Sequence, residues 1–431
     1  MREMKDSGVE WIGEIPADWN VGKTLYALSM PITDGPHETP ELFEEGIPFV
    51  SAEAVSCGNG HIDFEHIRGF ISQDFYDECC KKYIPEMHDI YMIKSGATTG
   101  KVAKVEKEKL FTIWSPLAVF RTNPKKCFYE YLYYFIQSDA YQKQIENKWT
   151  YGTQQNIGMR TLEKLMICFP SIDQQMNIAD YLDVKCSKID EIIEKQLSII
   201  EKLKEYKLSI ITEAVTSGIN PDVDMKDSGS VWFGSIPINW QMNRLKYVFH
   251  IQKDIAGEEG HTVLSITQRG IIPKDFSNNE GQFANSYANY QLVHKGDFAM
   301  NHMDLLTGWV DISKYEGVTS PDYRVFVLND KNGMCPEYYL YMMQMCYSAR
   351  IFYGLGQGVS GMGRWRLQAD KFLNFHIPIP PYDEQKIIAD YITDKVNHIE
   401  VEIDKRNKLI EKYQEYKKSL IYEVVTGKKE V

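Results

Sequence analysis

The sequence predicts a mixed α/β protein built as a tandem repeat, in which two globular domains are separated by a coiled coil of two long helices. Two repeated stretches and the character of the residues between them lead to this prediction. The stretch MKDSGVEWIGEIPADW at 4–19 returns as MKDSGSVWFGSIPINW at 225–240, and the segment that starts at Pro170 returns at Pro380. Self-similarity of this kind is the signature of a repeat architecture, here with pseudo-two-fold symmetry.

The repeated segments after Pro170 and Pro380 each read as one long helix. IADYL in the first segment aligns with IADYI in the second, and EKLKEYK aligns with EKYQEYK. Asp173 and Asp383 follow a Pro-containing turn and are expected as N-caps, while Gly218 and Gly427 lie just past the ends. The narrow apolar stripe is typical of a coiled-coil seam. The alternative is two amphipathic helices that each pack on their own domain. The stripe consists of Ile189, Ile193, Ile200, Leu203 and Ile210, matched by Ile399, Ile403, Ile410, Tyr413 and Leu420.

The two domains between these repeats are related but divergent. We expect an opening segment and the first domain at 1–168, the first long helix at 169–219, a joint with the second opening and the second domain at 220–378, and the second long helix at 379–431. The run WSPLAVF at 114 is similar to TSPDYRVF at 319. Short Val/Ile/Phe strands, Gly-rich turns and a helix over 129–144 predict a mixed α/β fold for each domain. The Tyr-rich runs YLYYF and YYLYMM are expected to be helix core.

The composition is that of a soluble globular protein, with 43% hydrophobic and 25% charged residues among 431. No run of about 18 apolar residues occurs, and the N-terminus has no apolar stretch typical of a secretory signal. The eight cysteines form no C-x-x-C pair. We therefore expect a cytoplasmic protein with reduced thiols and no membrane contact.

The net charge of −12 is opposite to the basic footprint of most nucleic-acid binders. Its distribution changes that picture. Residues 20–168 carry 16 Lys/Arg and 19 Asp/Glu, and residues 241–378 carry 13 of each. The remaining negative charge lies in the openings, the joint and the helices, so both domains are near neutral and able to present basic faces locally.

No motif in the chain predicts catalysis. SGATTGKV at 95–102 is too short between its glycines for a Walker loop, and Val102 replaces the Ser/Thr that would hold Mg²⁺. IPPY at 379–382 has Ile where amino-methyltransferases need a polar acceptor. The histidines form no H-E-x-x-H, and no Ser or Cys lies in a nucleophile elbow. We expect a non-catalytic chain with no cofactor or metal of its own.

A duplicated frame that carries divergent domains resembles the specificity subunit of type I DNA restriction-modification systems. The resemblance covers essentially the whole chain, and its most specific parts are the doubled opening, the IADYL/IADYI helices and the stretches SGATTGKV and YGTQQNIG. It implies two target-recognition domains that each read one half of a split sequence in double-stranded DNA. It also implies that the two long helices form an antiparallel coiled coil that acts as a ruler. About 40 helical residues would span roughly 60 Å, more than one DNA turn.

The same resemblance implies partners. The frame would dock two adenine-N6 methyltransferase (modification) subunits, and restriction/translocase subunits would complete the complex. S-adenosylmethionine, ATP and Mg would belong to those partners. Two alternatives remain: a silent recombination cassette of the same family, and a tandem coiled-coil scaffold with no DNA role.

DNA readout requires amide, hydroxyl and guanidinium groups at base edges and cations at phosphates. Glycine- and amide-rich loops before each long helix supply such groups. The paired glutamines suit adenine, and the arginines that flank Trp365 suit guanine or phosphate; ordinary polar turns and surface arginines are the alternatives. His37 is added because the resemblance places its stretch near DNA. The candidates are Ser95, Thr98, Thr99, Lys101, Thr153, Gln154, Gln155, Asn156 and His37 in the first domain, and Arg269, Asn301, His302, Gln357, Ser360, Arg364 and Arg366 in the second.

Overall fold

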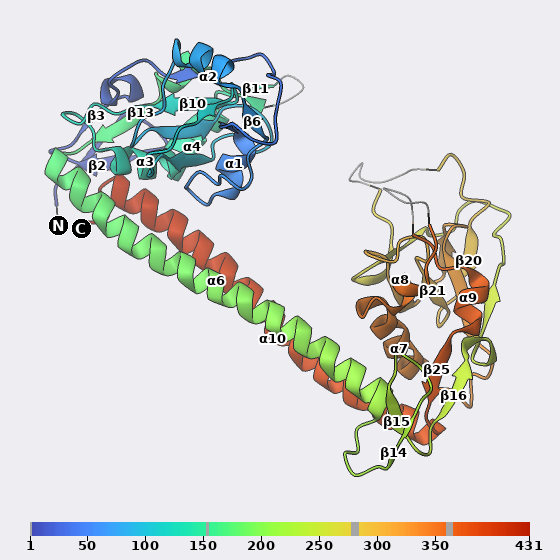
Figure 1. The fold of residues 1–431 in the computed structure, drawn as a ribbon. Coiled ribbons are helices and arrows are strands. Elements are labelled where there is room, and N and C mark those ends of the chain that lie inside the picture. The colour runs from blue at the N-terminus through green and yellow to red at the C-terminus, as the bar shows by residue number, and fades with distance from the viewer. Residues whose placement is uncertain (1, 152–154, 277–283, 359–364) are drawn as a thin grey trace. The chain divides into compact units, whose positions relative to one another are not determined.

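The computed structural model describes residues 2–151, 155–276, 284–358 and 365–431, and Figure 1 shows its helices and strands as a ribbon. The chain divides into two compact units, Met1–Gln196 with Asn407–Val431, and Leu197–Arg406. Two long helices, α6 (Ile172–Ser217) and α10 (Tyr382–Val425), each contribute to both units. The mixed α/β prediction is confirmed.

The first unit is built on a four-stranded antiparallel sheet in the order β4-β10-β7-β8. A second sheet, β6-β5-β9, contains the parallel pair β5 and β9. The elements are β1 Met4–Asp6, β2 Glu14–Pro16, β3 Asn20–Lys23, the 3-10 helix η1 Thr24–Ala27, β4 Thr33–Asp34, β5 Ile47–Val50, α1 Ala52–Cys57, β6 Phe70–Ile71, α2 Gln73–Cys80, β7 Ile90–Ile93, β8 Val102–Lys104, β9 Thr112–Ile113, β10 Leu117–Phe120, α3 Tyr129–Gln137, α4 Asp139–Glu146, β11 Thr150–Tyr151, β12 Gln155–Asn156, α5 Met159–Leu162 and β13 Met166–Phe169.

The second unit repeats the four-stranded antiparallel sheet in the order β17-β24-β21-β22. Its elements are β14 Met225–Asp227, β15 Ser235–Pro237, β16 Gln241–Arg244, the 3-10 helix η2 Leu245–Tyr247, β17 Phe249–Gln252, β18 Leu264–Thr267, β19 Gly270–Pro273, β20 Gln291–Val293, β21 Phe298–Met300, β22 Val310–Ile312, β23 Gly317–Thr319, β24 Arg324–Leu328, α7 Pro336–Ser348, α8 Ile351–Leu355, α9 Ala369–Asn374 and β25 His376–Ile379.

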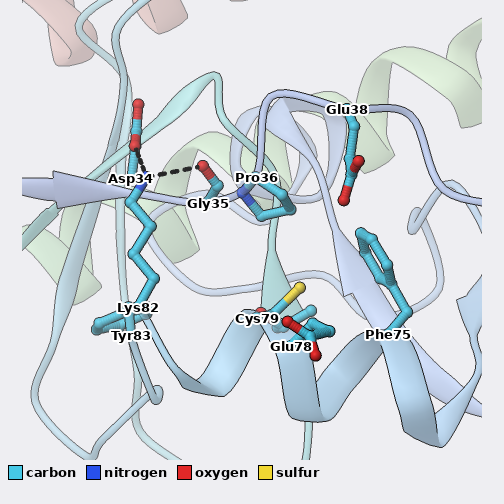
Figure 2. A pocket seen from close by; sticks show the side chains of 10 residues that line it. Asp34, Gly35, Pro36, Glu38, Phe75, Glu78, Cys79, Lys82 and Tyr83 are labelled. Atoms are coloured by element: carbon cyan, nitrogen blue, oxygen red, sulfur yellow. Dashed lines mark hydrogen bonds and ion pairs between the residues drawn. The ribbon is translucent and has the colours of Figure 1, made fainter.

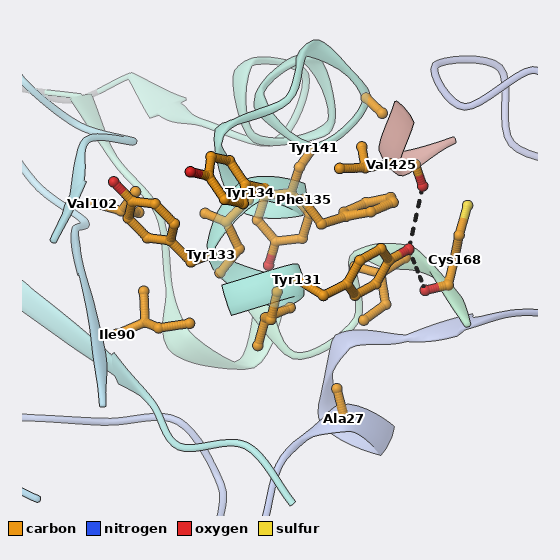
Figure 3. Packing of buried hydrophobic residues seen from close by; sticks show 14 of the residues in the cluster. Ala27, Ile90, Val102, Tyr131, Tyr133, Tyr134, Phe135, Tyr141, Cys168 and Val425 are labelled. Carbon is orange, nitrogen blue, oxygen red and sulfur yellow. Dashed lines mark hydrogen bonds between the residues drawn. The ribbon is translucent and has the colours of Figure 1, made fainter. Parts of the chain in front are cut away.

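The tyrosine-rich helices α3 and α7 form the centre of the two cores, as expected. Tyr131 and Tyr338 are fully buried. Figure 3 shows Tyr131 among the residues that pack around α3, with its hydroxyl directed at two backbone carbonyls. The hydroxyl donates to Cys168 O at 3.0 Å and Val425 O at 3.2 Å. Tyr338 makes the same pair of bonds, to Pro378 O and Val215 O.

The single helix expected over 129–144 is wrong, because the chain breaks at Ser138 into α3 and α4. Ser138 has an extended conformation, and its hydroxyl donates to Phe135 O at 2.6 Å. The Ser138 carbonyl then accepts the N–H groups of Tyr141 and Gln142 in the first turn of α4. A serine that bonds to the preceding turn competes with continued helix, and the sequence periodicity does not reveal this.

The long helices begin one residue before the expected N-caps. Ser171 caps α6: its hydroxyl accepts the N–H of Gln174, and the Gln174 side chain accepts the N–H of Ser171, which is a capping box. Asp173 and Asp383 lie in the first turns, where a carboxylate is favourable beside the helix dipole.

Within each unit the two long helices pack against each other in antiparallel directions. In the first unit, Ile178 and Leu182 near the start of α6 share a core with Leu420 and Val424 near the end of α10. In the second, Ile211 near the end of α6 shares a core with α10 residues Ile388 and Ile392. Inter-helix ion pairs join Lys417 to Asp190 and Lys207 to Glu400. The alternative of separately packed helices is therefore wrong.

The doubled opening builds a socket for the end of a long helix. In the first unit, Trp19 is 2% exposed and packs with Val424 and Val425 of α10. The Lys428 ammonium donates to Ile12 O and Glu14 O. In the second unit Trp240 is fully buried and packs with Val215 of α6. Each opening thus receives the last turn of the helix that begins in the other repeat.

Candidate nucleic-acid interface

The first-domain candidates Ser95 to Lys101 form the turn between the antiparallel strands β7 and β8. Gly96 and Gly100 have φ of +102° and +94°, conformations that favour glycine. Thr99 donates its hydroxyl to Gly96 O at 2.7 Å, and the Gly100 N–H returns to Ile93 O. A strand-to-strand turn differs from the strand-to-helix connection of a Walker loop.

The fold brings the second candidate stretch of the first domain to this turn. The Gly96 N–H donates to Gln155 O at 3.0 Å, and Ser95 forms a β-bridge with Asn156. The Ile157 N–H donates to Lys94 O at 2.9 Å. Asn156 and Lys101 are exposed, and Ser95, Thr98, Thr99 and Gln155 are half-buried. Thr153 and Gln154 lie outside the described residues.

His37 joins this edge through a buried carboxylate. Asp34, at the end of β4, lies 3.3 Å from the Lys94 ammonium and 3.2 Å from the imidazole of His37. The His37 side chain is 70% exposed. Burial alone would raise the pKa of Asp34, but the hydrogen bond and charge of Lys82, with those of Lys94, hold the pKa below its usual value. Lys94 directly precedes Ser95, so His37, Asp34 and the β7–β8 turn form one continuous edge.

Asp34 also lines a cavity of about 170 Å³. Figure 2 shows Lys82 reaching Asp34 and Gly35 beside this cavity, with Glu38 and Glu78 among the lining residues. These carboxylates make the cavity unfavourable for a DNA phosphate. We therefore exclude it from the candidate interface.

The second domain repeats the same edge with different residues. Asn301 and His302 directly follow β21. They correspond to Ile93, the last residue of β7, and to Lys94, which follows β7. The Leu367 N–H donates to His302 O at 3.0 Å, as Ile157 does to Lys94 O. Gln357 and Arg366 exchange two backbone hydrogen bonds of 2.8 and 3.0 Å. Ser360 and Arg364 lie outside the described residues.

Arg269 lies in the β18–β19 turn and is exposed. Its neighbour Gln268 donates to Thr307 O at 3.4 Å, which ties this turn to the loop after His302. Trp365 stacks on Tyr353 and donates its indole N–H to Tyr353 O at 2.7 Å. The tryptophan therefore anchors the base of the glycine-rich loop, and Arg366 beside it is exposed.

Sequence reasoning missed three groups at these edges. Asp34 and Lys94 were not predicted as an ion pair, and Arg324 was not singled out. The only available signal for Arg324 was an arginine in the run SPDYRVF where the first domain has apolar SPLAVF.

In the described parts of the chain, no three His, Cys, Asp or Glu side chains gather as a metal site. Across those same parts, no helix is long and apolar enough to cross a membrane.

The chain therefore contains two related α/β domains, each with a polar edge built in the same way. The chain belongs to the family of type I restriction-modification specificity subunits, because the model of the type I restriction modification DNA specificity domain matches it twice, at residues 36–202 and 237–412.

Individual relatives agree with this assignment. The chain is 24% identical over 389 residues to the type I restriction enzyme MjaVIII specificity subunit of Methanocaldococcus jannaschii, with 85% of each chain covered. It is 26% identical over 434 residues to the putative type I restriction enzyme MjaX specificity subunit of the same organism, covering 97% of this chain and 95% of the relative. A solved chain, described by the complex assembly and conformational transition of the type I R-M system, has a TM-score of 0.67 at 12% identity and coverage of 95% and 98%, which shows a common fold.

Proposed function

We propose that this chain is the DNA sequence-recognition subunit of a type I restriction-modification complex. Each globular domain reads one half of a bipartite target, and the paired helices set the spacing between the halves. The observation that carries the proposal is the double match of a DNA-specificity family to one chain, with one polar edge in each matched part.

The composition of the edges supports direct readout of DNA. Gln155 and Asn156 in the first domain and Gln357 in the second have amide side chains, the type that pairs with adenine in the major groove. Arg366 has a guanidinium group, which suits guanine or a backbone phosphate. The two edges share backbone geometry and differ in side chains. Different side chains on one frame would give each half-site its own base preference.

The proposal assigns the chemistry to partners. Two adenine-N6 methyltransferase subunits would dock on the helices and openings and bring S-adenosylmethionine. Restriction/translocase subunits would bring ATP and Mg. The chain itself would be a non-catalytic cytoplasmic reader of double-stranded DNA.

The direct test is a genome-wide map of N6-methyladenine in the native host, with and without this gene. We expect one split motif, with two short half-sites and a fixed gap, to lose methylation when the gene is deleted. Restoring the gene should restore the motif.

Identical maps would contradict the proposal for that cell. A silent recombination cassette and a scaffold without a DNA role would then be distinguished by affinity purification of the chain. Recovery of methyltransferase subunits would favour the cassette, and their absence would favour the scaffold.

A further inference from the structure

The two four-stranded sheets allow a position-by-position comparison of the two edges. Ala118 of β10 pairs with Met92 of β7, and Arg324 of β24 pairs with Met300 of β21. Arg324 therefore occupies the place of Ala118. Asp34 lies opposite Ala118 in the first sheet. The register of β17 with β24, continued by one residue, puts Lys253 opposite Arg324.

Around Ala118, the first domain pairs its positive charge with a carboxylate. Around Arg324, the second domain does not. Lys94 of the first domain is paired with Asp34 at 3.3 Å. In the second domain His302 takes the place of Lys94 and Lys253 takes the place of Asp34, and Arg324 adds a cation where the first domain has alanine. Arg366 lies next to Leu367, as Asn156 lies next to Ile157, and is a further cation.

Arg324 is a buried cation without an acidic partner among the described residues. It is 5% exposed, and its guanidinium donates to Leu367 O at 2.9 Å and to Met300 Sδ at 4.0 Å. The guanidinium also lies over the Phe372 ring, 5.0 Å from the ring centroid. By contrast, Arg121 of the first domain makes two hydrogen bonds of 2.8 Å to Asp89 and another to Glu86. A carbonyl hydrogen bond and an aromatic ring offset only part of the cost of burying a guanidinium charge, so an external anion near a buried arginine without an acidic partner is favourable.

His302 lies among the same cationic side chains. Its Nδ1 atom is buried without a hydrogen-bond partner in the structure. Burial first, and then the charges of Arg324, Arg366 and Lys253, lower the pKa of His302 to about 3. Burial also lowers the pKa of Arg324 to about 10.

We propose that Lys253, His302, Arg324 and Arg366 form a binding site for a phosphate-type anion in the second domain, and that the first domain has no such site at the corresponding place. The exposed Arg366 and Lys253 would contact the anion, and Arg324 would supply charge from beneath while holding Leu367. This inference rests on the proposed function for its ligand, because the anion would be a backbone phosphate of the second half-site.

Inorganic phosphate tests the site without DNA. Thermal unfolding of the full chain is measured in phosphate and in chloride at equal ionic strength. We expect phosphate to raise the unfolding midpoint of the wild type and to have a clearly smaller effect on Arg366→Ala, an exposed change, and on Arg324→Met. The matched control Lys94→Met should keep the wild-type response. Equal phosphate responses in the wild type and both second-domain variants would overturn the anion site.

DNA binding tests the source of the phosphate. The chain, assembled with its modification subunits, is titrated with duplex that carries the motif found by methylation mapping. Arg366→Ala and Arg324→Met are expected to weaken binding about tenfold for all sequences and to lower the salt dependence by about one released ion. Unchanged affinity and salt dependence would leave DNA reading intact and refute the phosphate assignment. A changed base preference with unchanged salt dependence would also refute it. Failure of the wild type to bind any motif would refute the proposed function, and the phosphate titration would still decide the anion site.

Discussion

Single buried polar residues hold the start of each long helix to its domain. Gln175 is fully buried, accepts the Phe128 N–H at 2.8 Å and donates to Lys126 O and Pro170 O. Gln385 repeats this role, accepting the Cys335 N–H and donating to Pro380 O. The two glutamines align in the sequence, but only their buried partners distinguish them from the exposed polar residues around them.

Replacement of Gln175 by leucine should destabilise the protein strongly. The substitution leaves one N–H and two carbonyl groups unpaired in the interior, with an expected cost of about 2–4 kcal/mol. Urea unfolding measures this loss, and Gln385→Leu should behave alike. Asn177→Ala, an exposed change two residues away, serves as the control. A Gln175→Leu protein as stable as this control would show that the buried bonds contribute little.

Asp34 should make the stability of the first unit depend on acid pH. Because its pKa is lowered in the folded state, the ionised carboxylate stabilises the fold above its unfolded pKa of about 3.9, and this contribution is lost as pH falls through the folded value. Asp34→Asn should therefore be less stable than the wild type at pH 7, with a smaller difference near pH 3. Urea unfolding at both pH values tests this. Glu41→Gln, at an exposed acid, controls for net charge, and a difference that grows on acidification would contradict the sign.

Both long helices are followed by a glycine, but the space around the two glycines differs. Gly218 and Gly427 have φ of +77° and +72°, as expected for glycine after a helix. A Cβ on Gly218 would lie no closer than 3.4 Å to its neighbours. A Cβ on Gly427 would lie 2.5 Å from two ring atoms of Pro16 and 3.0 Å from Trp19.

Alanine should therefore be tolerated less well at the second position. Gly218→Ala is expected to cost about 1–2 kcal/mol from the left-handed conformation alone. Gly427→Ala should cost on the order of 2–4 kcal/mol, because the rigid Pro16 ring must also move. Thermal unfolding of the two variants compares them directly. An equal loss at both positions would mean that Pro16 and Trp19 move aside at no measurable cost in stability.

The paired helices should set the gap in the DNA target if the proposed function holds. Removing four residues from the middle of both α6 and α10 shortens each by about 6 Å, close to two base pairs. The methylated motif should then change its gap or disappear. Replacing the same four positions by alanine preserves length and should preserve the gap. An unchanged motif after the paired deletion would remove the ruler role.

For the whole molecule, the charge distribution predicts weak DNA binding by the chain alone. Cation–phosphate contacts supply most non-specific affinity, and the net charge is −12. Fluorescence anisotropy with motif DNA should show weak, salt-sensitive binding by the isolated chain and much tighter binding after addition of the modification subunits. Tight sequence-specific binding by the isolated chain would contradict this expectation. A duplex with a scrambled motif is the control.

The sequence by itself determined the tandem plan, the mixed α/β class and the two long helices. These follow from periodicity and repetition, which are local and visible in one dimension. It also nominated both stretches of the first-domain edge, Ser95–Lys101 and Gln155–Asn156, as polar groups on turns. It misplaced both N-caps by one residue and missed the break at Ser138. At Ser171 and Ser138 the reason is a serine hydroxyl that bonds to the adjacent backbone.

Only the tertiary structure decided which distant residues meet. Ser95 pairs with Asn156, each opening receives the end of the other repeat's helix, and Arg324 takes the place of Ala118 beside His302. Sheet register and burial set these neighbours, and they act between residues far apart in the chain. The charge balance of each edge depends on those neighbours: Asp34 neutralises Lys94 in one domain, and no described carboxylate pairs with Arg324 in the other.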